Sequence, residues 1–352
     1  MAEVKLTEID LYRDRIKKIA EEKIEWSKLE DQTILMTGAT GMIGKMLIDV
    51  LMYKNDKSEK KIHIIGVGRS AEKAKKRLGD YFGREDFEFL EMNISNAVIS
   101  NKKIDYIIHA ASATHPLQYS GDPVGTIIPN VIGLNNLLKL AIEEEVKRVI
   151  FLSSVEIYGE NRGDVEKFDE KYLGYIDCNT LRAGYTESKR VGEALCQAYK
   201  EQYGLDFVTL RLARVFGPTM LMGDSKASSQ FIKNALAKED IVLKSKGTQE
   251  YSYLYVADAV RAILYGLVVA ESGEAYNVAD EKFNISLKDF ASICAEIAGK
   301  KVIFELPSEQ EIKGFSKASK ALLDGTKFRE IGFLIEDSIE DCLSETLNIL
   351  RE

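Results

Sequence analysis

From Thr33 onward, short continuous apolar runs alternate with longer segments whose apolar positions recur at helical spacing. Strands that are apolar throughout are typical of a parallel sheet covered by helices on both faces. The alternation therefore predicts an α/β fold built on a doubly wound parallel sheet. The runs predict strands at 33–37, 62–67, 87–92, 106–111, 148–153 and 207–213, and the segments between them predict helices at about 42–53, 71–82, 124–144 and 184–203.

The segments on either side of this pattern differ from it. Apolar residues at helical spacing over 7–24 predict an amphipathic helix, so we expect residues 1–30 to form a helical N-terminal extension. Residues 31–213 form the predicted sheet domain. Residues 214–352 are mixed, with short strands and with helices near 226–238, 286–298 and 337–351. We expect them to form mostly a smaller mixed α/β substrate lobe, from which 253–280 returns to the sheet domain.

Composition narrows the class of protein. The chain has 352 residues, of which 45% are hydrophobic and 30% charged, and this balance is typical of a globular protein. A net charge of −8 argues against a nucleic-acid partner, which would require clustered Lys and Arg. No apolar run approaches the roughly 18–20 residues that span a membrane, and the N-terminus lacks an apolar signal core, so we expect a cytoplasmic protein. The four cysteines suit no metal site.

A glycine triplet lies between the first predicted strand and the following helix. Gly38, Gly41 and Gly44 form G-x-x-G-x-x-G. In this setting one glycine allows a tight turn, one lets the backbone approach a pyrophosphate, and one lets helix and strand pack closely. The free N–H groups of the helix N-terminus then bind the anion. The residues 31–213 are therefore predicted to bind a dinucleotide, with contacts from Gly38, Thr40, Gly41, Met42, Ile43, Gly44, Asn93, Ile94, Ala110 and Ala111.

The end of the second strand bears on the kind of dinucleotide. NAD sites usually carry an acidic residue there to hold the ribose hydroxyls. This chain has Gly66-Val67-Gly68-Arg69-Ser70 instead. The Arg69 guanidinium could bind a 2′-phosphate, which gives a slight lean to NADP, or it could be a solvated side chain. NAD and NADP both remain open at this point.

A serine, a tyrosine and a lysine form the candidate catalytic group. Tyr185 and Lys189 lie four residues apart on a predicted helix and so share one face, while Ser154 ends an earlier strand. A phenol with a pKa near 10 is a poor base, but a neighbouring ammonium ion stabilises the phenolate. The serine hydroxyl can hold the substrate oxygen. The group is suited to removing a hydroxyl proton while a hydride leaves to the cofactor.

Three motifs carry a family resemblance. GATGMIG at 38–44, FLSSVEIYG at 151–159 and YTESK at 185–189 resemble the signatures of extended short-chain dehydrogenases/reductases, the NAD-dependent epimerase/dehydratase family, from about residue 32 to the C-terminus. The resemblance implies a Rossmann-type fold, a nucleotide-sugar substrate, a cofactor that is reduced and reoxidised within one turnover, and a transient 4-keto sugar. It also implies that Tyr185 and Lys189 contact the cofactor.

Several stretches most resemble the UDP-glucuronate decarboxylases within that family: 109–134, 181–193 and 217–236. By this resemblance Glu156 is a further catalytic residue, and Ser112 is a candidate substrate contact. Besides the missing acidic residue at the end of the second strand, two positions depart from the subgroup. Arg214 replaces an Asn that contacts the nucleotide diphosphate, and Tyr251 replaces an Arg. We expect Arg214 to supply the phosphate-binding charge that is lost at Tyr251.

Several readings of the activity remain. The first is a nucleotide-sugar decarboxylase, 4-epimerase or 4,6-dehydratase, although a dehydratase is expected to carry an acidic residue where Val155 stands. The second is an NADP-dependent carbonyl reductase that releases its cofactor, and the third is a non-catalytic binding protein. By resemblance we expect a homodimer formed through helices at 130–145 and 184–203. An apolar stripe on the first helix either joins the dimer or covers the sheet: Leu137, Leu138, Leu140 and Ala141.

Overall fold

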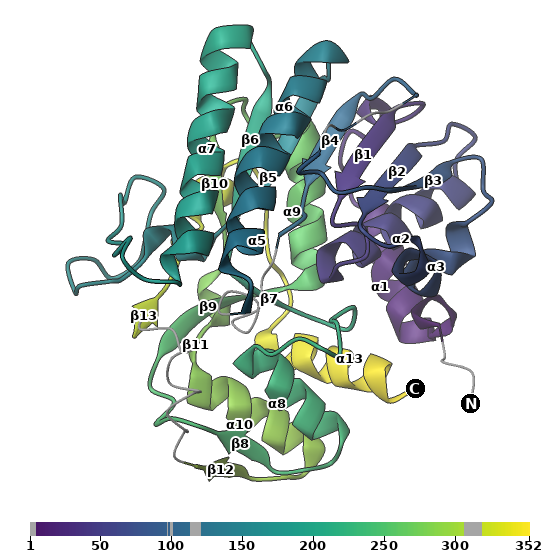
Figure 1. The fold of residues 1–352 in the computed structure, drawn as a ribbon. Helices are drawn as coiled ribbons and strands as arrows, with labels where there is room; N and C mark the ends of the chain where they lie inside the picture. Colours follow the sequence, from purple (N-terminus) through teal and green to yellow (C-terminus); the bar gives the residue numbers. More distant parts are fainter. Residues whose placement is uncertain (1–4, 97, 99–100, 113–120, 306–318) are drawn as a thin grey trace.

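A seven-stranded parallel sheet forms the centre of the molecule in the computed structural model, which describes residues 5–96, 98, 101–112, 121–305 and 319–352 (Figure 1). Its strand order is β10-β6-β5-β4-β1-β2-β3. The order reverses between β1 and β4, where two neighbouring strands lead away in opposite directions. This arrangement confirms the predicted doubly wound α/β fold. The strands are β1 (Thr33–Thr37), β2 (His63–Gly68), β3 (Phe87–Glu91), β4 (Tyr106–His109), β5 (Arg148–Ser154), β6 (Phe207–Leu212) and β10 (Ala275–Val278).

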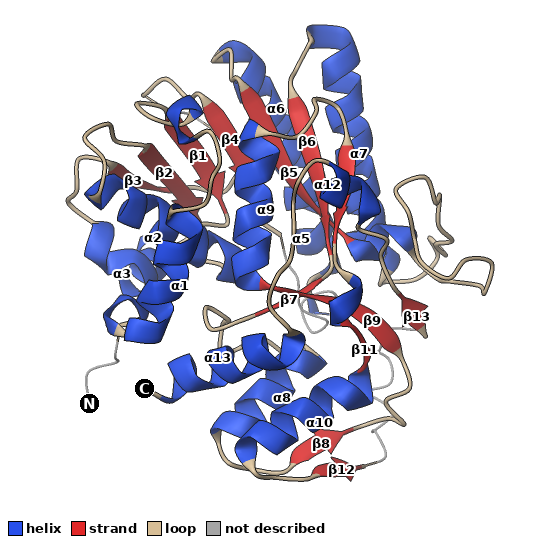
Figure 2. Cartoon of the chain, turned by 180° about the vertical axis from the view of Figure 1, so that it is seen from behind, coloured by secondary structure: helices blue, strands red, loops and turns tan. Residues whose placement is uncertain are grey.

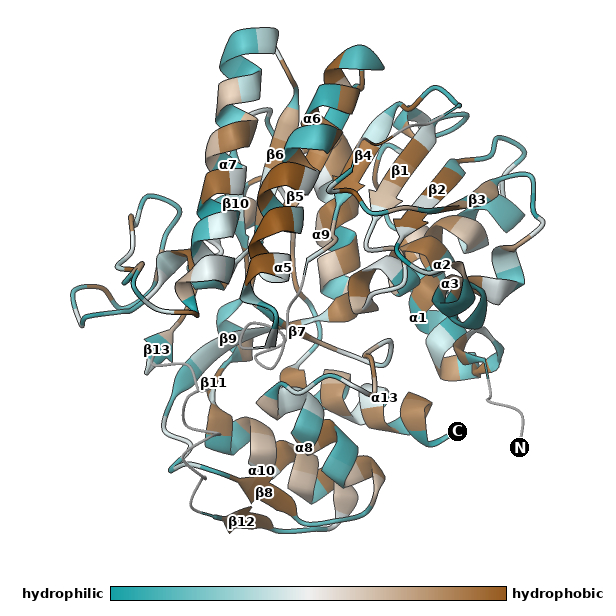
Figure 3. Cartoon of the chain, viewed as in Figure 1, coloured by the Kyte–Doolittle hydropathy of each residue, from teal (hydrophilic) through white to brown (hydrophobic). Residues whose placement is uncertain are grey.

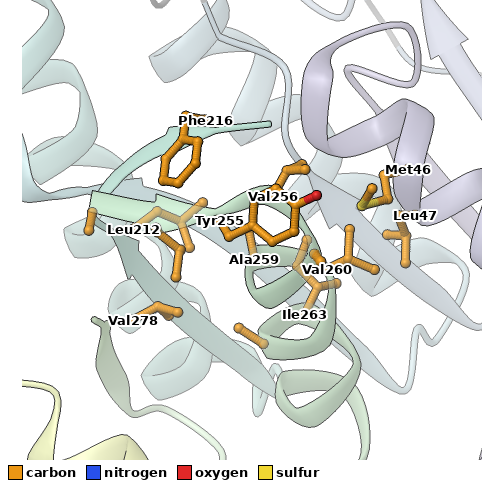
Figure 4. Close-up of a cluster of buried hydrophobic side chains, with 14 of the residues drawn as sticks. Met46, Leu47, Leu212, Phe216, Tyr255, Val256, Ala259, Val260, Ile263 and Val278 are labelled. Carbon is orange, nitrogen blue, oxygen red and sulfur yellow. The ribbon is translucent and has the colours of Figure 1, made fainter. Parts of the chain in front are cut away.

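Helices cover both faces of the sheet and enclose two apolar cores. The larger core joins α2 (Met42–Asp56) and α9 (Val256–Val268) to one face. Figure 4 shows side chains of α9 packed between Met46 and Leu47 of α2 and the ends of the strands. The second core joins α6 (Leu134–Glu143) and α7 (Ala183–Tyr203) to the other face. Figure 2 shows α9, α2 and α3 (Ala71–Leu78) on the side opposite α6 and α7.

The helix predicted over 124–144 is a continuous helical run with a π turn in its middle. It comprises α5 (Pro123–Ile128), η4 (Pro129–Gly133) and α6. The apolar stripe of α6 is fully buried in the second core, so it covers the sheet: Leu137, Leu138, Leu140 and Ala141. By length and composition alone, the run from Pro123 to Glu143 could cross a membrane, but 44% of its most apolar window is buried in the protein. Helices in the cores of soluble proteins can have the same length and apolar composition.

The second lobe begins where the sheet ends, because β7 (Arg214–Phe216) follows β6 after a single residue. Figures 1 and 2 show this lobe below the main sheet. The chain leaves the lobe through α9 and β10, and β10 pairs with β6 of the main sheet. The lobe contains β8 (Ile241–Leu243), β9 (Glu250–Tyr255), β11 (Asn284–Ser286), β12 (Val302–Phe304), β13 (Lys320–Ala321), α8 (Ala227–Leu236), α10 (Leu287–Ala298) and α13 (Ile339–Arg351).

The N-terminal extension is docked on the sheet domain rather than free. It contains η1 (Leu6–Glu8), α1 (Asp10–Ala20) and η2 (Trp26–Lys28). The Tyr12 hydroxyl donates a buried 2.6 Å hydrogen bond to Asp49 of α2, and Arg15 pairs with Asp337 and Glu345 near the C-terminus. The remaining short elements are η3 (Gly79–Tyr81), η5 (Val155–Tyr158), η6 (Glu281–Phe283) and α12 (Thr326–Glu330).

Candidate active site

The glycine-rich loop connects β1 to the first turn of α2. Gly38 has φ +73°, and a Cβ atom there would lie 2.7 Å from the carbonyl carbon of Ala110. A Cβ atom at Gly44 would overlap the Gly38 carbonyl oxygen. Gly41 is the N-cap of α2 and has no side chain with which to cap the free N–H groups of that helix. The loop thus leaves room and backbone N–H donors for an anion at the point between β1 and β4 where the strand order reverses. These residues fit a dinucleotide pyrophosphate.

The other predicted cofactor contacts differ in how close they lie to this loop. Ala111 follows β4, and its N–H donates to the Thr37 hydroxyl at 3.2 Å, which holds the end of β4 beside the loop. The Asn93 side chain caps its own turn by accepting from the Ser95 N–H. Ile94 is buried in the second core, beside Gly133. Arg69 is exposed at the end of β2. Ala111 therefore lies at the loop, whereas the Ile94 side chain is occupied by core packing.

Ser154, Tyr185 and Ser112 meet at the carboxyl end of the sheet. The hydroxyls of Ser154 and Ser112 hydrogen-bond to the phenol oxygen of Tyr185. Burial raises the pKa of Tyr185 to about 12, although these hydrogen bonds act in the opposite direction. The structure therefore brings together two predicted catalytic residues and one predicted substrate contact. Tyr185 is a neutral phenol at neutral pH and must lose its proton to act as a base.

Lys189 lies one turn further along α7, behind Tyr185. Its ammonium group donates a 2.7 Å hydrogen bond to the Leu152 carbonyl of β5 and lies 4.9 Å from the centre of the Phe151 ring. Burial lowers the pKa of Lys189 to about 7, against the opposing charge of Glu193. At neutral pH its charge is therefore sensitive to small changes around it.

Glu156 sits between two arginines on the lobe side of Tyr185. Arg182 donates to one carboxylate oxygen at 2.9 Å, and Arg214 approaches the other at 3.5 Å. Burial by itself would raise the pKa of Glu156, but the charges of Arg182 and Arg214 hold it below its ordinary value. The Glu156 side chain is 23% exposed, so it remains open to a ligand. Glu156 is an ionised carboxylate within a positively charged surround.

Arg214 and Tyr251, the two residues at which the sequence departs from the subgroup, are in direct contact. The Arg214 guanidinium carbon lies 3.8 Å from the centre of the Tyr251 ring, a close cation–π pair. Their strands β7 and β9 are paired in parallel. The ring supports the guanidinium on the side where it reaches Glu156, so Arg214 points toward Glu156 and not away from it. That Arg214 binds a phosphate stays a prediction.

Sequence reasoning missed two cations of this cluster. Arg182 precedes Tyr185 by three residues, at the N-terminus of α7, so helical spacing alone could have placed it beside the tyrosine. Lys226 acts on Glu156 through its charge, and no pattern in the sequence marks it. Glu156 with these two residues, Arg214 and Tyr251 is called the charge cluster below.

A buried polar network fixes α7 against the strands. Glu193 accepts a 2.6 Å hydrogen bond from Ser153 of β5 and a 2.6 Å ion pair from Arg211 of β6. Arg211 also donates to the Tyr158 hydroxyl at 2.8 Å. These contacts hold the helix of Tyr185 and Lys189 in position. Within the described part of the chain, no group of three or more His, Cys, Asp or Glu side chains could hold a metal ion.

Comparison with known protein families gives one match that covers most of the chain. A family model described as "NAD dependent epimerase/dehydratase family" matches residues 34–279, which include the glycine loop and the catalytic group. UDP-glucuronic acid decarboxylase 6 of Arabidopsis thaliana is 33% identical over 231 residues, 66% of this chain and 64% of the relative. UDP-glucuronic acid decarboxylase 1 of Xenopus tropicalis is 29% identical over 273 residues, 78% of this chain and 62% of the relative. The matches thus span less than two thirds of these relatives.

Solved structures share the fold at lower sequence identity. The UDP-glucose 4-epimerase of Thermotoga maritima, solved with UDP-glucose, superposes with a TM-score of 0.76 at 24% identity, covering 91% of this chain and 99% of that one. The UDP-glucuronic acid 4-epimerase of Bacillus cereus, solved with UDP-glucuronic acid and NAD, gives 0.75 at 23% identity, with the same coverage. The family description names NAD, and nothing in these comparisons supports the lean to NADP drawn from Arg69.

Proposed function

Because the chain belongs to the NAD-dependent epimerase/dehydratase family, we propose that it binds NAD and transiently oxidises the C4 hydroxyl of a nucleotide-sugar. We further propose that the sugar is a hexuronate and that the reaction is its decarboxylation. One observation carries the choice of reaction. Arg182, Arg214 and Lys226 surround Glu156, two residues from Ser154 and beside Tyr185, and their surplus positive charge suits the carboxylate of a hexuronate.

The residues around Tyr185 account for the oxidation step. Ser154 and Ser112 hydrogen-bond to the phenol oxygen and can share these bonds with the C4 hydroxyl of the sugar. Tyr185 removes the hydroxyl proton as a general base once a nearby positive charge has lowered its pKa. Lys189 supplies such a charge from the next turn of the same helix. When bound, NAD would supply the hydride acceptor and later return that hydride.

Decarboxylation follows from the position of the new carbonyl group. A C4 ketone is β to the C6 carboxylate, so the C5–C6 bond can break with its electron pair moving onto the C4 oxygen, and CO2 leaves. C5 then takes up a proton, and reduction of the ketone restores the C4 hydroxyl. Arg182, Arg214 and Lys226 carry three positive charges, against two negative charges on Glu156 and on Asp224, which pairs with Lys226 at 3.7 Å. The remaining positive charge suits an acidic sugar in the same place.

A product assay tests this proposal. The purified protein is incubated with UDP-glucuronate and NAD, and the products are separated by chromatography and weighed by mass spectrometry. Loss of CO2 in the wild type and its absence in Tyr185→Phe is the expected result. A product of unchanged mass but altered mobility would instead indicate 4-epimerisation, which needs only the serine, tyrosine and lysine. Unchanged UDP-glucuronate, with NAD bound, would contradict the substrate assignment.

We also propose that the protein is a homodimer, joined through α5, η4 and α7. The stripe of α6 is buried and cannot join the interface, but apolar side chains earlier in the same helical run and on α7 are exposed. They are Val124, Ile128, Ile132 and Val191. Figure 3 shows the apolar composition of α5 along its ribbon. Light scattering on the purified protein should give twice the chain mass, and Ile132→Glu combined with Val191→Glu should give a folded monomer. A monomeric wild type would contradict the proposal.

A further inference from the structure

His109, the last residue of β4, is a buried histidine beside the catalytic lysine. Its side chain is 0% exposed. The sheet register places it between Thr37 of β1 and Phe151 of β5, so all three side chains project from the same face. Thr37 immediately precedes the glycine loop, and Phe151 lies under the ammonium group of Lys189. The imidazole therefore occupies the space between the cofactor loop and the catalytic helix.

Contacts fix the ring but use only one of its two nitrogens. The Nδ1 atom lies 2.8 Å from the Thr37 hydroxyl oxygen, which also accepts the N–H of Ala111. The ring stacks on Phe151 with centres 5.9 Å apart and planes inclined by 14°. The Nε2 atom is buried and has no hydrogen-bond partner among the described residues. A buried polar nitrogen without a partner is unfavourable, so this atom calls for an explanation.

Burial, and after it the charge of Lys189, explains why the ring is neutral. Burial, together with the charge of Lys189, lowers the pKa of His109 to about 3, so the imidazole is neutral. If Nδ1 donates its hydrogen to Thr37, Nε2 presents a lone pair. Lys189 has three N–H donors, and the Leu152 carbonyl takes one of them. A neutral acceptor close to a buried ammonium group favours the charged form of that group.

We propose that His109 is a positioning residue for the Tyr185–Lys189 pair. Its Nε2 lone pair is linked to the Lys189 ammonium group through one buried water and so keeps the lysine charged and aligned behind the tyrosine. The Thr37 hydroxyl accepts the Ala111 N–H and can also accept the Nδ1 hydrogen of His109, which leaves the Nε2 lone pair free. The role in turnover rests on the proposed function, in which the lysine charge activates Tyr185. The link between His109 and Lys189 does not depend on the identity of the substrate.

Other groups that act on Lys189 must be held constant in a test. Glu193 and Cys196 lie on its own helix and act on its pKa. Arg211 of β6 is paired with Glu193, and β5 contributes the Leu152 carbonyl and the Phe151 ring. None of these residues is altered by a substitution at position 109. A change at His109 thus isolates the contribution of its nitrogen.

The test is an NMR titration of the lysine side chains in protein labelled with carbon-13 at Cε. The Lys189 signal is identified by its loss in Lys189→Met. His109→Phe keeps the stacking ring but removes the lone pair, and we expect the titration midpoint of Lys189 to fall by about one pH unit. His109→Gln retains an acceptor and should restore most of the difference. The control His63→Phe alters a histidine at the start of β2 and should leave the midpoint unchanged.

The outcomes separate this inference from the proposed function. An unchanged Lys189 midpoint in folded His109→Phe overturns the inference, whatever the product assay gives. A lowered midpoint in a protein that does not act on UDP-glucuronate supports the inference and counts against the proposed substrate. Where activity is present, the pH profile of turnover should shift in His109→Phe and recover in His109→Gln. If His109→Phe does not fold, His109→Leu, which also lacks the lone pair, replaces it, and an unchanged midpoint there overturns the inference.

Discussion

The glycine loop and the charge cluster lie at the same end of the sheet but are built on opposite principles. The loop is one run of seven residues, 38–44, and works because side chains are absent where the backbone of Ala110 and Gly38 comes close. The charge cluster draws Glu156, Arg182 and Arg214 from separate segments and works because of the side chains that are present. Changes in the loop should alter shape and binding, whereas changes in the cluster should alter chemistry.

Replacement of Glu156 by Gln gives the sharpest test of this difference. The amide has nearly the same shape but lacks the charge that holds Arg182 and Arg214 in place, so we expect turnover to fall by roughly 100-fold, or about 2.7 kcal/mol. NAD affinity should stay close to that of the wild type, whereas thermal stability should fall slightly, because the lowered pKa of Glu156 shows that Arg182 and Arg214 stabilise its ionised form. Steady-state kinetics, calorimetric NAD titration and thermal melting measure the three quantities.

The matched control for Glu156 is Glu187→Gln. Glu187 pairs with Arg190 on the same helix as Tyr185, so the control removes a carboxylate close to the site without touching the charge cluster. Its turnover should remain near that of the wild type. Equal losses of turnover in the two variants would mean that any nearby negative charge has the same effect. The specific role proposed for Glu156 in the charge cluster would then be contradicted.

Replacement of Gly38 by Ala should show the reverse pattern. The φ of +73° is unfavourable for alanine, and the new Cβ atom would lie within 2.8 Å of three backbone atoms of Ala110 and Ala111. We expect NAD affinity to fall by about 10- to 100-fold, which corresponds to about 1.4–2.8 kcal/mol. Calorimetric titration measures the loss. Gly79→Ala is the control, because a Cβ atom there meets nothing within 4 Å, and a comparable loss in that variant would contradict the explanation.

The same contrast explains how much the sequence could reveal. The strand and helix pattern and the Gly38–Gly44 spacing are local signals, and they predicted the parallel sheet and its phosphate-binding turn. Tyr185 and Lys189 were visible because helical spacing places them on one face. Lys226 was missed because its position beside Glu156 depends on how distant segments meet, whereas Arg182 was missed although helical spacing places it near Tyr185. The π turn at Pro129–Gly133 was also missed, since helical periodicity alone predicts an unbroken helix.

Lys189 lies between the two regions, and its burial has a consequence for stability. Its pKa is about 7 in the folded chain, against 10.5 for an ordinary lysine. Between these values the unfolded state binds more protons, so the contribution of this group to the free energy of unfolding rises with pH. Lys189→Met should therefore be more stable than the wild type at pH 7, by about 1–3 kcal/mol, and this advantage should shrink toward pH 10.

Urea unfolding of the cofactor-free proteins at several pH values measures this difference. Lys200→Met is the control, because Lys200 lies on the same helix and also donates to a backbone carbonyl at 2.7 Å. A difference between Lys189→Met and the wild type that stays constant from pH 7 to pH 10 would show that the Lys189 charge is not penalised by burial.

The smallest expected effect tests whether the two regions are independent. Thr219 lies in the lobe segment after β7, and its hydroxyl donates to the Met42 carbonyl of α2 at 2.8 Å. The Thr219 carbonyl accepts a hydrogen bond from Arg77 of α3 at 2.7 Å. Thr219→Val removes only the hydroxyl contact. We expect a loss of stability of about 1 kcal/mol, as for a typical buried hydrogen bond. We also expect a two- to fivefold loss of NAD affinity, because the first turn of α2 loses one of its supports.

The control for Thr219 must lose the same chemical contact elsewhere. Thr346 is also fully buried, and its hydroxyl donates to the Cys342 carbonyl at 2.7 Å within α13. Thr346→Val should match the stability loss without changing NAD affinity. If NAD affinity in Thr219→Val equals that of the control, contacts from the lobe do not affect NAD binding at the glycine loop. The loop and the charge cluster would then be joined only through a ligand that contacts both, and substrate binding would require no rearrangement of the cofactor site.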